Sequence, residues 1–193
     1  MHTVVTTPNE LLDAAVAAAR HQEASNLCEL DHLPTAIYTT NAEGRITYFN
    51  QACVDFSGRT PQVGQDSWCV SWKLFTEHGE YLPHDQCPMA VAIREKQPVR
   101  GVAAIAERPD GSRVNFIPYP TPLLDEDGEL IGAVNILIDI TEPCARAEHY
   151  RSQALRCRRL ANAMGDRRTS STLLLMADEY EQKARKCSAT NSA

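Results

Sequence analysis

The residues with the clearest chemical potential lie in one short stretch between positions 78 and 87. His78, His84 and Cys87 follow the spacing H-x5-H-x2-C, and Asp85 lies between the last two. Imidazole nitrogens and thiolates are ligands that zinc prefers, and a structural zinc site needs four of them in a tetrahedron. No second cluster in the sequence completes the set. We therefore interpret these residues as parts of a solvent-exposed loop and predict no metal site.

Motifs that accompany catalysis are missing from the sequence. It has no GxSxG, no Walker A loop, no HExxH and no GxGxxG. His149 falls in a helix-prone segment and is expected to lie on a solvated helix surface. We therefore expect a protein that is not an enzyme and has no catalytic residues.

Arginines crowd one segment near the C-terminal end of the chain. They are Arg146, Arg151, Arg156, Arg158, Arg159, Arg167 and Arg168. Only two acidic residues oppose them between positions 145 and 168, so this segment carries +5 in a chain of net charge −6. A basic segment in an otherwise acidic chain can bind an acidic part of the same chain, an acidic protein or a phosphate backbone. No aromatic platform or DNA-binding motif accompanies the arginines, so we favour self-docking or protein contact over nucleic acid.

Hydrophobic spacing divides the chain into three segments that would position these residues. Residues 1–31 are predicted to form an N-terminal helical cap, because leucine and alanine recur at helical spacing from Leu11 to Ala19. Residues 32–142 hold nearly all of the proline, glycine and aromatic residues and are predicted to form an α+β domain. Residues 143–193 are predicted to form two helices and a disordered tail.

The middle segment predicts a five-stranded antiparallel sheet with short helices on one face. Strand-prone runs at 35–40 and 45–49 flank an Asn/Gly turn and predict a hairpin. Short helices are expected from Asn50 to Gly58 and over 86–96, where Pro88 fits the first turn. Strands are expected at 99–107, 113–124 and 129–140, separated by Asp-Gly turns. The order β-β-α-α-β-β-β is typical of an α+β fold.

The last segment carries a heptad-like seam of small and aromatic residues. Its members are Ala147, Tyr150, Ala154, Cys157, Ala161 and Met164, followed by Leu173, Ala177, Tyr180, Ala184 and Cys187. Spacings that alternate between three and four indicate a helical hairpin or a coiled-coil-like bundle. Small residues bury little apolar area, so the pair is expected to need a partner surface.

The amino-acid composition indicates the cellular compartment in which the protein is expected to work. The chain has 193 residues, 43% of them hydrophobic, and its seven cysteines form no CxxC pair. An odd, scattered set of cysteines suits free thiols in a reducing compartment. No apolar run approaches the roughly 20 residues of a spanning helix, and no basic n-region marks a signal peptide. We expect a cytoplasmic protein without a membrane partner.

Short motifs in the middle segment together resemble a PAS sensor domain. The resemblance rests on Leu33-Pro34-x-Ala36-Ile37, Glu43-Gly44-Arg45-Ile46-x-Tyr48-x-Asn50-x-Ala52, Asp110-Gly111-Ser112-Arg113, Pro122-Leu123-x-Asp125-x-Asp127-Gly128, Gly132-Ala133-Val134 and Asp139-Ile140-Thr141-Glu142. It implies a sheet cupped over short helices with a small cavity between them. It also implies that the flanking helices pair two chains and carry a signal onward.

The resemblance and the alternation of strand residues suggest which side chains face the cavity. We predict Tyr38, Phe56, Trp72, Met89, Ile93, Asn115 and Asn135. Flavin-binding light sensors of the family carry an Asn-Cys-Arg-Phe-Leu-Gln segment, which the equivalent region 64–70 lacks. Asn115 and Asn135 nevertheless lie where such domains place flavin-contacting amides. Haem-binding members suggest His84 or Cys87 as an axial ligand. We expect no cofactor, with haem and flavin as alternatives.

These observations lead to one reading and two alternatives. The chain is expected to be a PAS sensory or interaction module in signal transduction that binds a small ligand or a protein partner. It would relay the signal through its flanking helices and form a homodimer through them. One alternative is a haem- or flavin-dependent redox, gas or light sensor. The other is a regulator of transcription that acts through the Arg-rich C-terminal helix.

Overall fold

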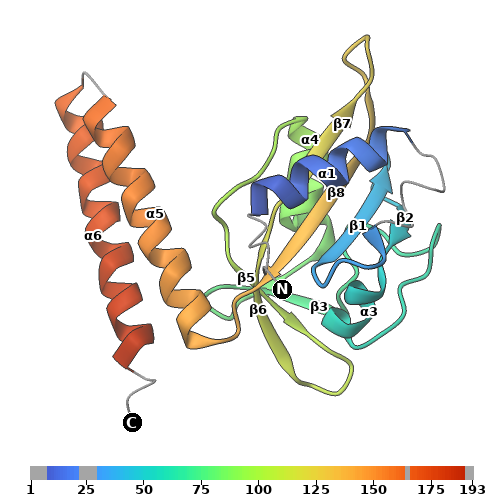
Figure 1. The fold of residues 1–193 in the computed structure, drawn as a ribbon, viewed down its shortest axis with the longest axis horizontal. Helices are drawn as coiled ribbons and strands as arrows, with labels where there is room; N and C mark the ends of the chain where they lie inside the picture. Colours follow the sequence, from blue (N-terminus) through green and yellow to red (C-terminus); the bar gives the residue numbers. More distant parts are fainter. Residues whose placement is uncertain (1–7, 22–29, 164–165, 190–193) are drawn as a thin grey trace, which may run out of the picture. The chain divides into compact units, whose positions relative to one another are not determined.

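The computed structural model describes residues 8–21, 30–163 and 166–189 (Figure 1). The chain divides into two compact units, Met1–Ile138 and Asp139–Ala193. Within the described residues, no helix combines the length and the apolar character that crossing a bilayer requires.

An antiparallel sheet organises the first unit. Its strands are β1 (Ala36–Asn41), β2 (Ile46–Phe49), β3 (Lys73–Thr76), β4 (Tyr81–Leu82), β5 (Ala104–Glu107), β6 (Arg113–Pro118), β7 (Thr121–Leu124) and β8 (Leu130–Asp139). They follow the order β2-β1-β8-β6-β5-β3-β4, and β7 pairs with β8 beside this path. The predicted α+β class and the antiparallel pairing are confirmed.

The sheet has more strands than the five that the sequence predicted. The run at 113–124 is interrupted because it contains Pro118, Pro120 and Pro122, and proline cannot donate a ladder hydrogen bond. In addition, β3 and β4 form a short hairpin within residues 59–85, where the residue pattern shows little periodicity. Gly79 at a φ of 86° accommodates the turn between them.

Both predicted short helices are present; the first lies between β2 and β3, and the second lies between β4 and β5, because the β3–β4 hairpin separates them. α3 (Gln51–Ser57) begins after Asn50, whose side chain accepts a hydrogen bond from the backbone of Cys53, and ends at Gly58 in the left-handed region. A 3-10 turn, η1 (His84–Gln86), precedes α4 (Pro88–Glu95), which has its proline at the first helical position.

Hydrophobic side chains pack on both faces of the sheet. We call the cluster between the sheet, α3 and α4 the interior core; it includes Phe56, Met89 and Phe116. On the opposite face, α1 (Pro8–His21) lies over β1, β7 and β8 (Figure 1) and packs Leu12, Ala15, Ala18 and Ala19 against them. Neighbouring residues of β8 alternate between these two clusters, as the strand period of two requires.

The second unit is a helical hairpin. α5 (Pro143–Ala163) and α6 (Arg167–Ala189) pack along the predicted seam, where Ala154, Cys157 and Ala177 are buried and Tyr180 packs against them. The rings of Tyr150 and Tyr180 stack at a centroid distance of 6.3 Å. The helices therefore pair within one chain. Met164 of the predicted seam lies outside the described residues.

Candidate functional site

Five of the seven predicted cavity residues meet in the interior of the first unit. Tyr38, Phe56, Met89, Ile93 and Asn135 are each at most 6% exposed. Four of them belong to the interior core, and Asn135 joins them through a hydrogen bond to Tyr38. The sequence pattern therefore placed these side chains on one side of the sheet.

The other two predicted cavity residues lie elsewhere. Trp72 is 52% exposed in the segment before β3. Asn115 stands between Val114 and Phe116, which both pack in the interior core, so the strand alternation directs its side chain to the opposite face. Its cross-strand partner there is Ile105. The prediction that Asn115 faces the cavity is therefore wrong, because its two hydrophobic neighbours in β6 take the side of the strand that faces the core.

A chain of hydrogen bonds runs through the interior at Tyr38. The amide Nδ2 of Asn135 donates to the Tyr38 hydroxyl at 2.9 Å, and this hydroxyl donates to the backbone carbonyl of Trp68 at 2.9 Å. The Oδ1 of Asn135 accepts from the backbone N–H of Tyr119 at 2.9 Å. Burial raises the pKa of Tyr38 well above its usual value, so the phenol stays neutral and able to donate.

Trp68 holds an unusual backbone conformation. Its φ is 70°, a left-handed value that bulky residues rarely adopt and that costs about 1–3 kcal/mol. The Trp68 N–H donates to the carbonyl of Gly44 at 2.7 Å, and the indole packs so closely that a Cβ atom on Gly44 would overlap it. Sequence reasoning missed Trp68 because its role depends on its backbone carbonyl, which no residue pattern reveals.

Three free cysteines share the interior core with Tyr38. Cys53 donates to the carbonyl of Ile37 at 3.2 Å, Cys69 lies 3.5 Å from the hydroxyl of Ser71, and Cys87 lies 3.9 Å from the carbonyl of Trp68. Burial raises the pKa of all three thiols, that of Cys87 to about 12. They are therefore protonated at neutral pH and are weak nucleophiles.

The residues fit the two candidate cofactors unequally. The flavin alternative relied on two amides, but Asn115 faces away from the interior and both ends of the Asn135 amide are engaged, so these residues do not fit a flavin. Of the two candidate haem ligands, Cys87 is a protonated thiol. His84 has a buried Nε2 without a hydrogen-bond partner, and burial followed by the charge of Arg59 lowers its pKa. A neutral imidazole of this kind is a competent haem ligand.

Metal binding by the 78–87 stretch finds no support in the geometry. No three His, Cys, Asp or Glu side chains converge on a common point in the part of the chain that the structure describes. His78 is exposed in the β3–β4 turn, while Cys87 is buried at the start of α4, which separates the spaced ligands in space.

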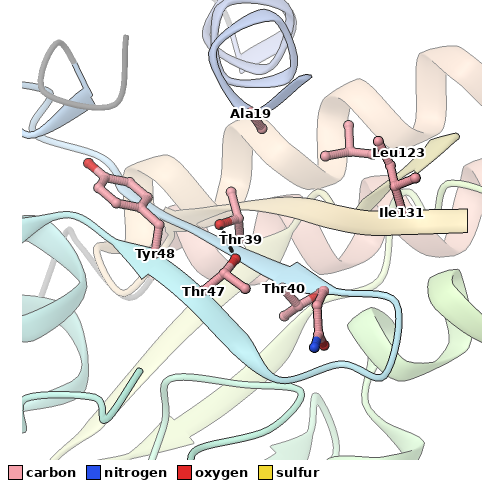
Figure 2. Close-up of a pocket in the computed structure, with 8 residues that line it drawn as sticks. Ala19, Thr39, Thr40, Thr47, Tyr48, Leu123 and Ile131 are labelled. Atoms are coloured by element: carbon pink, nitrogen blue, oxygen red, sulfur yellow. Dashed lines mark hydrogen bonds between the residues drawn. The ribbon is translucent and has the colours of Figure 1, made fainter. Parts of the chain in front are cut away.

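A second candidate site lies on the face of the sheet that α1 covers. A pocket of about 200 Å³ lies there, lined by Ala19, Thr39, Thr40, Asn41, Thr47, Tyr48, Leu123 and Ile131. Figure 2 shows these side chains around it. The hydroxyl oxygens of Thr39 and Thr47 are hydrogen-bonded at 2.7 Å. None of these eight side chains carries a charge. No residue pattern in the sequence indicates this pocket, because it arises where a helix crosses strands that are distant in the chain.

The Arg-rich segment is partly neutralised within the hairpin. The guanidinium of Arg158 on α5 pairs with Asp178, at 3.4 Å, and with Glu181, both on α6. At this position the expected contact with an acidic part of the same chain is present. Arg151, Arg156 and Arg159 are exposed.

Comparison with protein families identifies the fold of most of the first unit. A family model described as the PAS fold matches residues 30–144. Among solved structures, the chain is similar to the LOV domain of a blue-light activated histidine kinase from Erythrobacter litoralis, with 22% identity, a TM-score of 0.44, and coverage of 57% of this chain and 99% of that one.

Two further solved structures illustrate the range of matches. The PAS domain of the fruit-fly ELK potassium channel shares 19% identity at a TM-score of 0.46, covering 61% of this chain and 95% of that one. The RsLOV d2 variant shares 13% identity at a TM-score of 0.48, covering 93% of this chain and 97% of that one. No curated protein matches the sequence.

Proposed function

The chain belongs to the PAS-fold family, and we propose that it acts as a sensory and interaction module in signal transduction. The observation that carries this proposal is the buried hydrogen-bond chain from Trp68 through Tyr38 to Asn135. Its members are fully or largely buried polar groups in an otherwise apolar core, where a small ligand or a displaced loop would change their partners. Rearrangement there is the event that we propose the protein detects.

The relay would run along β8. Asn135 lies just past the middle of this strand, which ends at Asp139, and α5 begins at Pro143. A ligand that favours one arrangement of the Asn135 amide therefore shifts the population of conformations at the exit from the sheet. Only three residues separate that exit from the first helix of the hairpin, so little slack would absorb the change.

The hairpin is the proposed site of homodimerisation. It buries few large side chains between its own helices, while Leu155 and Leu175 are 59% and 66% exposed and Leu160, Leu174 and Met176 are exposed as well. Two antiparallel helices with so small a seam are marginal alone. A second hairpin that covers these leucines would supply the missing apolar burial.

Light scattering tests this assignment on the full chain. We expect a dimer that becomes a monomer when Leu174→Glu and Leu175→Glu are combined, and also when the chain is cut after Thr141. Val63→Glu is the matched control, because Val63 is an equally exposed apolar residue of the first unit. A dimer that survives both changes to the hairpin would refute the proposed role of these helices.

Haem sensing is a second candidate, favoured by the buried and unpaired Nε2 of His84. An absorption spectrum of protein from cells supplied with haem and flavin precursors tests it. A Soret band that disappears in His84→Ala would establish haem, and flavin bands would overturn our reading of Asn115 and Asn135. We expect absorption from tryptophan and tyrosine alone.

A further inference from the structure

We propose that the backbone carbonyl of Trp68 occupies the place of a ligand oxygen, and that the protein senses small, apolar compounds with one neutral carbonyl group. Such a compound would displace the Trp68 carbonyl from the Tyr38 hydroxyl. The inference rests on the proposed sensory function and names the ligand class for it. Two features of the interior support it: the Tyr38 hydroxyl is a hydrogen-bond donor of fixed direction, and the Trp68 backbone that accepts from it is strained.

The donor at Tyr38 has a fixed direction. Asn135 donates its Nδ2 hydrogen to the Tyr38 oxygen, so this oxygen acts as acceptor on that side and directs its own proton at the Trp68 carbonyl. The Oδ1 of Asn135 is held by the backbone N–H of Tyr119, which prevents the amide from turning over without loss of a hydrogen bond. The Cys87 thiol, 3.9 Å from the same carbonyl, points a weaker donor at the same position.

The carbonyl that now accepts from the Tyr38 hydroxyl belongs to a strained loop residue, Trp68. Trp68 belongs to neither a helix nor a strand, and its φ of 70° is unfavourable for a bulky side chain. Strain of this kind persists only where surrounding contacts impose it. Here the contacts are the Trp68 N–H bond to Gly44 and the packing of the indole on that glycine. The bond from the Tyr38 hydroxyl to the Trp68 carbonyl is a third contact of this kind, so a ligand that takes the hydroxyl removes one of the contacts that hold the strained backbone, and this favours the exchange.

The chemistry of the surroundings selects a neutral ligand. None of the side chains that the structure describes as buried carries a charge, and the guanidinium of Arg59, which donates to the carbonyl of Val70 at 3.0 Å, is already paired with Asp66. A carboxylate would therefore lose its hydration without an opposing charge to compensate. A ketone or amide oxygen replaces the amide oxygen of Trp68 like for like and keeps the Tyr38 hydroxyl satisfied.

The test compares three probes that share a benzene ring. Acetophenone has a neutral carbonyl, ethylbenzene has none, and benzoate has a charged group. Binding to the full-length protein is followed by chemical-shift titration, and in Trp72→Phe protein by the fluorescence of Trp68, then the sole tryptophan. We expect acetophenone to bind about five- to tenfold more tightly than ethylbenzene, the worth of one buried hydrogen bond, and benzoate to bind least.

Variants separate the donor from the occupant. Tyr38→Phe removes only the hydroxyl, so acetophenone and ethylbenzene should bind this variant with about equal affinity. Trp68→Ala loses the indole that holds the carbonyl in place and should tighten acetophenone binding, whereas Trp72→Ala, at an exposed tryptophan, should leave it unchanged. Equal binding of acetophenone and ethylbenzene, absence of binding by both, or a preference that survives Tyr38→Phe would overturn the inference. The dimer measurement above is independent of these probes, so it shows separately whether the sensory module itself is in doubt.

Discussion

At the scale of single residues, Asn50 links the segment before β1 to the start of α3. Its Oδ1 accepts from the N–H groups of Ile37 and Cys53, and its Nδ2 donates to the carbonyls of Leu30 and Thr35. The side chain is fully buried, so each of these backbone groups would lose its partner without a replacement from water.

We therefore expect Asn50→Ala to lower the free energy of unfolding by about 2–4 kcal/mol, since several buried groups lose partners and α3 loses its cap. Asn50→Asp should be damaging too, because a carboxylate cannot donate to the two carbonyls. Urea denaturation measures both. Asn41→Ala is the control: its Oδ1 accepts from Arg45 at an exposed turn, and the loss should stay below about 1 kcal/mol. Similar losses at positions 41 and 50 would contradict this account.

Gly44 and Gly111 allow the contact with Trp68 to be measured apart from backbone strain. Both have positive φ values, 79° and 84°, but only Gly44 faces the indole, while the space beside Gly111 is open. Gly111→Ala should cost about 1–2 kcal/mol, the price of a left-handed alanine. Gly44→Ala should cost more, because the indole must also move. The difference in unfolding free energy reports the packing of Trp68; equal values would show that the indole yields freely.

The buried thiols make stability depend on alkaline pH. The pKa of Cys87 rises from 9.0 to about 12 on folding, and those of Cys53 and Cys69 also rise, chiefly through burial. Below about pH 9 both folded and unfolded thiols are protonated, so the stability is complete. Between about pH 9 and 12 only the unfolded thiols ionise, and the stability falls. Urea unfolding over this range should show a shallower decline in Cys87→Ala; an unchanged slope would exclude this thiol as a cause.

At the scale of secondary-structure elements, local signals were sufficient for most of the first unit. The hairpin β1–β2, the capped helix α3 and the proline-initiated α4 follow from turn residues, caps and short hydrophobic runs that act within a few positions. The seam of the second unit follows from its heptad-like spacing. These elements are determined by neighbours along the chain, which a single sequence displays.

What the sequence did not reveal depends on contacts between distant segments. The side of the sheet on which Asn115 lies depends on which of its neighbours in β6 pack in the core. The exposure of Trp72 depends on the position at which β3 begins. The strained carbonyl of Trp68 exists because β1, β8 and the loop before β3 meet at Tyr38. These are tertiary contacts, which a single sequence does not display. The candidate site could therefore be predicted only in part, although the surrounding fold could be predicted.

At the scale of the whole molecule, the two units differ in charge. Residues 1–138 carry nine basic and eighteen acidic side chains, a net charge of −9, while residues 139–193 carry ten basic and seven acidic ones, a net charge of +3. This difference in charge distinguishes two modes of self-association: hairpin with hairpin, or the hairpin of one chain with the acidic unit of another.

Salt distinguishes these modes, because screening weakens both attraction and repulsion between exposed charges. Hairpins of the same net charge repel, so a dimer built from exposed leucines should tighten as sodium chloride rises from about 50 mM to about 500 mM. Contact between a basic hairpin and an acidic unit should weaken over the same range. We expect tightening, measured as the dissociation constant of the full chain by sedimentation. In Arg158→Ala, which leaves Asp178 and Glu181 without this partner and lowers the hairpin charge, the salt effect should shrink. A dimer that loosens with salt would instead place the acidic first unit in the interface and would exclude association through leucine contacts alone.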